Sequence, residues 1–174
     1  MADMTFTVKE NQTVARGMLI LYLNTGAADT PVWSPVGKRV EDSSAQYDWQ
    51  RESKKDILDT TYSTMKAPIV TQTFDPWELA NGDNAQLAIW NKAIREQDAQ
   101  ALCNMDMLMV HLYAGATDAA FAERYNASAV EVTGLGGAGG GNIGMPITVT
   151  FGGTRTVGTA KVANSTVTFT ADVA

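Results

Sequence analysis

One stretch, residues 36–79, constrains the fold more than any other part of this chain. Runs rich in Thr, Ser, Tyr, Trp, Val and Ile lie on both sides of a dense charge cluster, Arg51-Glu52-Ser53-Lys54-Lys55-Asp56. Those flanking residue types favour strands, so the pattern predicts a long β-hairpin over 36–74 with the charge cluster at its tip. Each arm would span about 14–18 residues, against roughly 5–6 in an ordinary strand. A two-stranded ribbon of that length is not stable alone in water, so we expect neighbouring subunits to order it.

The hairpin also has the composition of a protein–protein contact. Tyr47 and Trp49 share one face of the outgoing arm because side chains alternate along a strand, and aromatic rings with polar tips are enriched at interfaces. Basic and acidic residues balance within 38–66, whereas the whole chain carries a net charge of -6. Mixed charge protects an edge strand and sets register between copies. We therefore predict a subunit interface made by Tyr47, Trp49, Arg51, Glu52, Lys54, Lys55, Asp56 and Tyr62. The alternative is a solvated, mobile loop.

The remaining sequence indicates a mainly β fold, antiparallel and sandwich- or barrel-like, with one flanking α-helix and the long protruding hairpin. The apolar runs at 17–24 and 102–114 are typical of strands buried on both faces. Asp83 has the character of a helix cap, and Leu87, Trp90 and Ile94 recur at helical spacing, which predicts a helix over about 84–97. We expect Trp90 to be a core residue.

Four shorter patterns give local expectations. Asp75-Pro76-Trp77-Glu78 resembles a helix start, with a capping residue followed by proline and glutamate. Residues 118–125 have the composition of one or two helical turns. Gly152-Gly153 lies between two alternating runs and predicts a hairpin turn. Pro68 removes a ladder donor and predicts a break in the return arm.

Chain length predicts a single domain over 1–174. Within it we distinguish an N-terminal arm at 1–16, the charged hairpin at 36–74 and a glycine-rich loop at 134–144. The arm has strand character with little room to bury it, which favours docking on a neighbour. The N-terminus lacks the pattern of a secretory signal, and the longest apolar run is far shorter than a membrane span. We expect synthesis in a cytoplasm and no membrane partner.

Residues suited to catalysis or metal binding are scarce. The single cysteine, Cys103, is expected to be half-buried and inert, and the single histidine, His111, falls in an apolar run. These two residues cannot form a structural zinc site without carboxylates, and a Ser-His-Asp triad would need His111 outside the core. The Gly134–Gly139 stretch matches a dinucleotide fingerprint, but a strand rather than a helix is expected after it. We predict a non-enzymatic protein with no cofactor and no metal.

The whole layout resembles the major tail tube proteins of long-tailed, siphophage-type bacteriophages. The resemblance rests on the N-terminal arm, on Trp33-Ser-Pro-Val-Gly-Lys-Arg-Val40 leading into the charged hairpin, and on Asp75-Pro-Trp-Glu-Leu-Ala-Asn-Gly-Asp83 before the single helix. A Thr/Val/Gly-rich, strand-forming C-terminus follows. The glycine-rich loop matches no feature of that family.

The resemblance implies a structural virion protein of the bacteriophage tail. Its subunits would form stacked hexameric rings around a hollow tube through which DNA passes during ejection, without specific binding. Its partners would be other copies of itself and the tape measure, distal tail and terminator proteins. An acidic chain suits such a lumen, because it does not bind the phosphate backbone.

Other functions remain open on the same residues. The first is the tube protein of a contractile tail or injection system, which would share the fold. The second is another tail component, such as a terminator or decoration protein. A β-rich carbohydrate-binding module is the third, with Tyr47, Trp49 and Tyr62 as its aromatic platform, although the charges between them suit a sugar poorly.

Overall fold

The computed structural model describes residues 4–172, and its centre is an antiparallel pair of long strands. These are β7 (Met105–Ala116) and β8 (Ala119–Val132), joined by a short turn. On the far side of β7 lie β1 (Leu19–Asn24) and then β2 (Trp33–Pro35). The apolar runs of β1 and β7 are therefore neighbours in the middle of the sheet, as their composition predicts.

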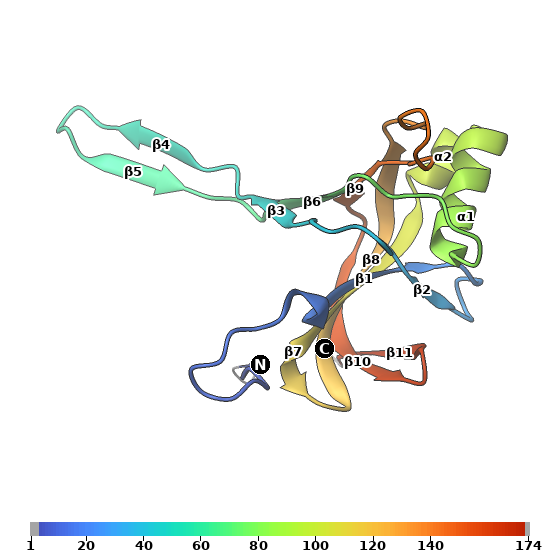
Figure 1. The fold of residues 1–174 in the computed structure, drawn as a ribbon. Coiled ribbons are helices and arrows are strands. Elements are labelled where there is room, and N and C mark those ends of the chain that lie inside the picture. The colour runs from blue at the N-terminus through green and yellow to red at the C-terminus, as the bar shows by residue number, and fades with distance from the viewer. Residues whose placement is uncertain (1–3, 173–174) are drawn as a thin grey trace.

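The other edge of β8 holds two strands in succession, and this divides the sheet into two branches (Figure 1). The C-terminal part of β8 pairs with β9 (Ile147–Phe151), which continues to β6 (Ile69–Phe74) and β3 (Ala45–Asp48). The N-terminal part pairs with β10 (Arg155–Ala163), which continues to β11 (Thr166–Ala171). All these pairings are antiparallel, which confirms the predicted mainly β, antiparallel class.

The prediction of a hairpin turn at Gly152-Gly153 is wrong. The two strands that flank these glycines do not pair with each other, because both pair with β8 and run in the same direction. Gly153 has a φ of +73°, and a Cβ there would lie 2.3 Å from the Asn126 Oδ1 atom. The same Oδ1 accepts the Thr154 backbone N–H at 2.7 Å. The glycines thus carry the chain from one branch to the other. The nearby hairpin turn is Asn164-Ser165, between β10 and β11.

Two apolar clusters lie on opposite faces of the central strands. On β7, Met105, Met107 and Met109 face one cluster, while Leu108 and Val110 face the other. The methionine stripe is thus packing, and it explains why the β7 run is apolar on both faces. The first cluster is the larger, and its fully buried members include Leu23, Trp77, Ile89, Met145, Ile147 and Val149.

One helical segment flanks this sheet. α1 (Asn84–Trp90) continues as a π-helical stretch, η2 (Asn91–Arg95), and a short α2 (Ala99–Leu102) follows. The Asp83 Oδ1 atom accepts the Gln86 backbone N–H at 3.1 Å, so the predicted cap is present. Ala85 and Ile89 are fully buried in the larger cluster. The single flanking helix is therefore confirmed, with its end two residues before the predicted one.

The two other helical expectations are wrong. Residues 75–78 form no helix, because their backbone pairs elsewhere: the Trp77 carbonyl accepts the Met145 N–H at 2.9 Å. Residues 118–125 run into β8, where cross-strand pairing on both edges outweighs the helical preference of Ala and Glu.

The hairpin is present, but its geometry differs from the prediction. β3 and β6 belong to the main sheet, whereas β4 (Glu52–Lys55) and β5 (Thr61–Thr64) form a separate two-stranded ribbon that projects away from the body (Figure 1). The return arm is interrupted over 65–68, as Pro68 predicts. The charge cluster is not the tip, because Glu52–Lys55 forms a strand and the turn follows at 56–60.

The N-terminal arm lies partly on its own subunit. Residues 1–3 fall outside the described residues. Phe6 bridges to Ala114, and the Thr7 N–H donates to the Tyr113 carbonyl at 2.8 Å, so the arm pairs with the end of β7. Phe6 nevertheless remains 66% exposed. The chain then enters a short 3-10 turn, η1 (Arg16–Met18). The loop at 134–144 is irregular, held by a Gly136–Gly144 bridge.

The bend at Gly153 gives the first prediction. Replacing Gly153 by Ala should lower the free energy of unfolding by roughly 1–3 kcal/mol, because the positive φ and the Asn126 contact both oppose a Cβ. Gly17→Ala is the control, since a Cβ at Gly17 meets nothing within 4 Å. Urea unfolding of both variants measures the difference. Equal stability of the two would contradict the role assigned to the bend.

Candidate subunit interface

The most exposed structure in the protein is the distal part of the hairpin, residues 49–66, called the ribbon below. Every residue in it is exposed except Asp56, which is half-buried. At about 3.3 Å per residue, eight residues from Trp49 to Ile57 carry the chain roughly 25 Å from the body. The Lys66 N–H donates to the Trp49 carbonyl at 3.0 Å and closes the base of the ribbon. No other part of the described chain extends so far (Figure 1).

Both faces of the ribbon are polar. Lys54 lies opposite Tyr62, and Glu52, two residues earlier on the same face, lies 3.8 Å from the Lys54 ammonium. On the other face the Ser53 and Ser63 hydroxyls are 2.9 Å apart. These groups pair mainly with one another, so register within the ribbon is specified by its own side chains.

The turn at the end of the ribbon is built by Asp56. Its Oδ1 atom accepts the backbone N–H groups of Leu58 at 2.8 Å and Thr60 at 2.9 Å. The Thr60 hydrogen bond is the main reason that the pKa of Asp56 lies below its usual value. Lys55 and Asp59 close the turn from outside with a 2.6 Å ion pair.

This turn presents two aliphatic side chains at the apex. Ile57 is 101% exposed and Leu58 80% exposed. The sequence interpretation missed both residues, because it placed the apex within the charge cluster. A signal was available: Asp-Ile-Leu-Asp puts an aspartate that favours turns directly before two apolar residues.

The predicted interface residues are distributed along the whole hairpin. Tyr47 is in β3, on the main sheet opposite Val70, and Trp49 begins the ribbon. The others lie within the ribbon, with Arg51 before β4. Counting residues along the return arm places Tyr62 roughly 25 Å from Val70, and so from Tyr47. The structure therefore does not unite Tyr47, Trp49 and Tyr62 in one sugar-binding platform. Whether the eight residues contact another subunit stays a prediction.

Unpaired sheet edges provide a second kind of contact surface. Among the described residues, β2, β3 and β11 each pair with one neighbouring strand only. Each therefore presents a row of free backbone N–H and C=O groups, which is a template for pairing with another chain. β2 and β3 end the long path of the sheet, and β11 ends its short branch.

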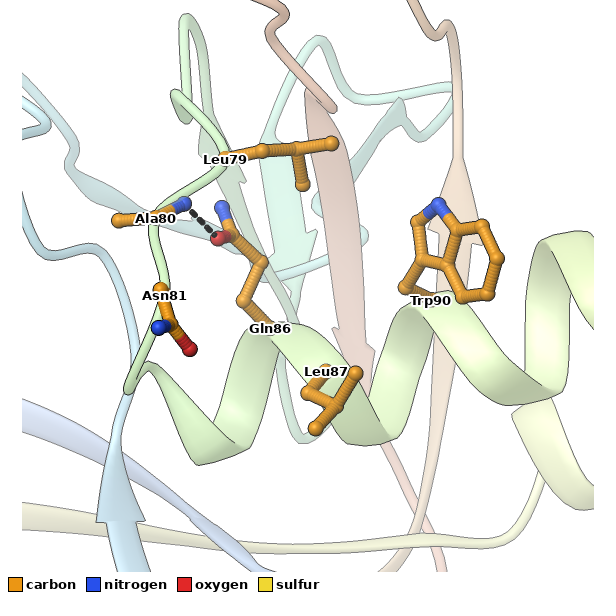
Figure 2. A pocket seen from close by; sticks show the side chains of 6 residues that line it. All are labelled: Leu79, Ala80, Asn81, Gln86, Leu87 and Trp90. Atoms are coloured by element: carbon orange, nitrogen blue, oxygen red, sulfur yellow. Dashed lines mark hydrogen bonds between the residues drawn. The ribbon is translucent and has the colours of Figure 1, made fainter.

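An apolar hollow lies beside α1, on the side of the molecule away from the ribbon (Figures 1 and 2). Its volume is about 360 Å³, and Leu79, Leu87 and Trp90 provide most of its apolar lining. Figure 2 shows the Gln86 amide oxygen accepting the Ala80 N–H, at 2.8 Å. Leu87 is 59% exposed although it lies on a helix that packs against the core. Trp90 is half-buried, so it is partly core and partly surface.

A charge cluster around the buried Glu123 joins β7, β8 and β10. Glu123 is 6% exposed, and its Oε1 accepts the Arg155 Nε–H at 2.7 Å while its Oε2 lies 3.2 Å from His111 Nε2. His111 Nδ1 is 2.8 Å from the Tyr113 hydroxyl. Burial raises the pKa of Glu123, but the hydrogen bonds and positive charge of His111 and Arg155 outweigh it, and the net shift is downward. All four side chains are engaged in structural contacts.

Little in the described residues suits catalysis. The prediction that Cys103 is half-buried is wrong: it is exposed, because it lies just after the short α2. Within residues 4–172, no cluster of three or more His, Cys, Asp or Glu side chains is arranged to hold a metal ion. None of the helices described in this range is both long and apolar enough to span a membrane.

No known family model matches the chain, and no curated protein matches it. Several solved structures are similar, and two of them are described here. The tube-terminating cap of an anti-feeding prophage is 14% identical, with a TM-score of 0.48 over 88% of this chain and 95% of the other. The sheath–tube complex of an extracellular contractile injection system is 9% identical, with a TM-score of 0.45 over 94% and 95%. Both are parts of phage-tail-like particles.

The Glu123 cluster gives the second prediction. Because the folded-state pKa of Glu123 is lowered, its stabilising effect is present above the ordinary value of 4.5 and is lost as pH falls through the lower folded value. Glu123→Gln should reduce the free energy of unfolding at pH 7 by about 1–3 kcal/mol and flatten its decline below pH 5. Urea unfolding between pH 3 and 7 measures both effects. The exposed Lys92–Glu96 pair supplies the control: Glu96→Gln should change stability by less than about 0.5 kcal/mol.

Proposed function

We propose that this protein is a tube-forming subunit of a phage-tail-like particle, in the wide class that includes contractile tails and injection systems. The observation that carries the proposal is the ribbon at 49–66. An isolated two-stranded ribbon is at best marginally stable in water, and this one has no body strand beside it. Contact with other copies would stabilise this projection and would explain why the chain has it.

The open edges of β2, β3 and β11 support a lateral contact between copies. Strand edges that would be a hazard in a monomer become an interface when the contact is made head to tail and the rotation closes into a ring. The ribbon then reaches beyond the ring to a further copy. This arrangement, edges within a ring and ribbons between rings, produces a tube.

The finer details of the proposal follow the family resemblance. Six copies would form each ring, and DNA would pass through the lumen without specific binding. The net charge of -6 fits that role, because a negative wall repels the phosphate backbone. The remaining partners would be tape measure, distal tail and terminator proteins, and the location would be the tail of the particle. The protein would act through assembly and not as an enzyme.

The third prediction concerns the assembly itself. Purified protein at high concentration should form rings or hollow tubes, visible by negative-stain electron microscopy. The physical reason is mass action on edges and ribbons that have no partner in the monomer. A protein that stays monomeric at every concentration, and binds glycans instead, would overturn the proposal.

The fourth prediction isolates the ribbon. Residues 50–65 are replaced by Asn-Gly, a pair that favours a tight hairpin turn between Trp49 and Lys66. β3 and β6 stay intact, and the free energy of unfolding should change little because the deleted residues are almost all exposed. The variant should be folded by circular dichroism but should form no tubes. Tubes of normal length from this variant would show that the ribbon makes no essential contact.

A further inference from the structure

The structure points to a specific receiver for the ribbon. We infer that the Ile57-Leu58 apex of one copy inserts into the hollow beside α1 of a second copy. This inference rests on the proposed self-assembly and adds to it the two surfaces that meet. The occupant is a second copy of this chain, and the contact is heterologous.

The apex has the chemistry of an anchor. Ile57 and Leu58 are branched aliphatic side chains almost wholly in water, at a position where the fold itself gains nothing from them. The turn beneath them is held by Asp56, Lys55 and Asp59, and this turn places the two side chains next to each other at the apex.

The charges next to the apex do not oppose its burial. Lys55 is neutralised by Asp59 at 2.6 Å, and the Asp56 carboxylate accepts two backbone N–H groups. The segment 38–66 is balanced in charge, so the excess of acidic residues lies in the rest of the chain. The ribbon itself holds four basic and three acidic residues, so it approaches an acidic body without net repulsion.

The hollow fits this apex in size and polarity. Its polar lining is limited to Asn81 and Gln86, and the Gln86 amide is already bonded to Ala80 N–H and Glu78 C=O at 2.8 and 2.9 Å. A cavity of about 150 Å³ lined by aliphatic groups holds a benzene molecule. The open volume of about 360 Å³ therefore has room for the two smaller aliphatic side chains.

Geometry excludes insertion within one molecule. The ribbon leaves the body on the side away from α1 (Figure 1), and α1 provides half of the residues that line the hollow. An apex at one end and its receiver at the other give a contact that each new copy repeats. Such a contact propagates as a ring or a filament.

A second hollow on the helical side provides a matched comparison. It lies between the helices and the end of β8, with Leu102, Val132 and Leu135 in its lining and a volume of about 520 Å³. The exposed Glu131 carboxylate and Thr133 also line it, so an aliphatic apex fits it less well. Leu135 is 48% exposed, close to the value for Leu87.

Cross-linking between two separately made variants tests the pairing. Both carry Cys103→Ser, which removes the only native thiol. One also carries Leu58→Cys and the other Leu87→Cys. The two are mixed, concentrated and treated with a short bis-maleimide, and mass spectrometry identifies the products. The expected product is a dimer with one chain of each kind, absent when either variant is treated alone. The comparison mixture replaces Leu87→Cys by Leu135→Cys and should yield at least tenfold less.

The outcomes separate this inference from the proposed function. Tubes without the Leu58–Leu87 product, or with an equal Leu58–Leu135 product, overturn the inference and leave the tube function standing. The Leu58–Leu87 product without rings or tubes supports the inference and overturns the tube function. Absence of both products and assemblies overturns both.

Substitutions that place polar or charged side chains in the contact provide a second, independent test of the inference. Leu87→Glu keeps a good helix former in α1, and it should raise the concentration needed for assembly at least about tenfold, as should Ile57→Ser with Leu58→Ser. Leu135→Glu should leave that concentration unchanged. Sedimentation at a series of protein concentrations measures it, and urea unfolding checks that each variant is folded. Normal assembly of folded Leu87→Glu protein would overturn the inference.

Discussion

The arrangement of the whole sheet depends on β8. One edge of β8 pairs with β7, and two strands share the other edge. Its C-terminal part holds β9 and its N-terminal part holds β10, and the chain passes from one to the other through Gly152 and Gly153. Neighbouring side chains fix this register from both faces: Glu123 bonds Arg155 of β10, and Arg124 bonds Asp106 of β7 at 2.7 Å. Without that division, β6 and β3 would have no place in the sheet, and the ribbon would have no base from which to project.

Sequence reasoning succeeded where the determining interactions are local. The cap at Asp83, the break at Pro68 and the buried runs at 19–24 and 105–116 follow from propensity, capping and apolar pattern. It was wrong where a distant strand decides the outcome. Residues 118–125 have a helical composition, yet pairing on two edges makes most of them part of β8. The Gly152-Gly153 pair predicts a hairpin turn, because no local signal shows that both flanking strands share one partner.

For the candidate interface too, the sequence predicts the features that depend on residue type and misses those that depend on the fold. Composition identified the exposed segment and its mixture of aromatic and charged residues, since these properties belong to the residues themselves. It did not identify the apex, because the position of a turn depends on which side chain can hold it. Here the Asp56 carboxylate binds the N–H groups two and four residues onward, and so moves the apex to Ile57 and Leu58. The sequence does not predict the Leu87 hollow, because the hollow depends on how residues 79–81 fold back over α1.

The internal contacts of the ribbon explain how so exposed a structure can serve assembly. Its ion pairs and the Ser53–Ser63 contact are solvent-exposed, so each contributes at most about 1 kcal/mol. Such contacts specify register without giving the ribbon high stability, and they leave few unpaired charges to desolvate on binding. Specificity then depends on the aliphatic apex, because polar faces that are already paired gain little from a new neighbour. In the assembly that we propose, a ribbon of this kind would separate two tasks: its length would set the spacing between copies, and its apex would set where the next copy binds.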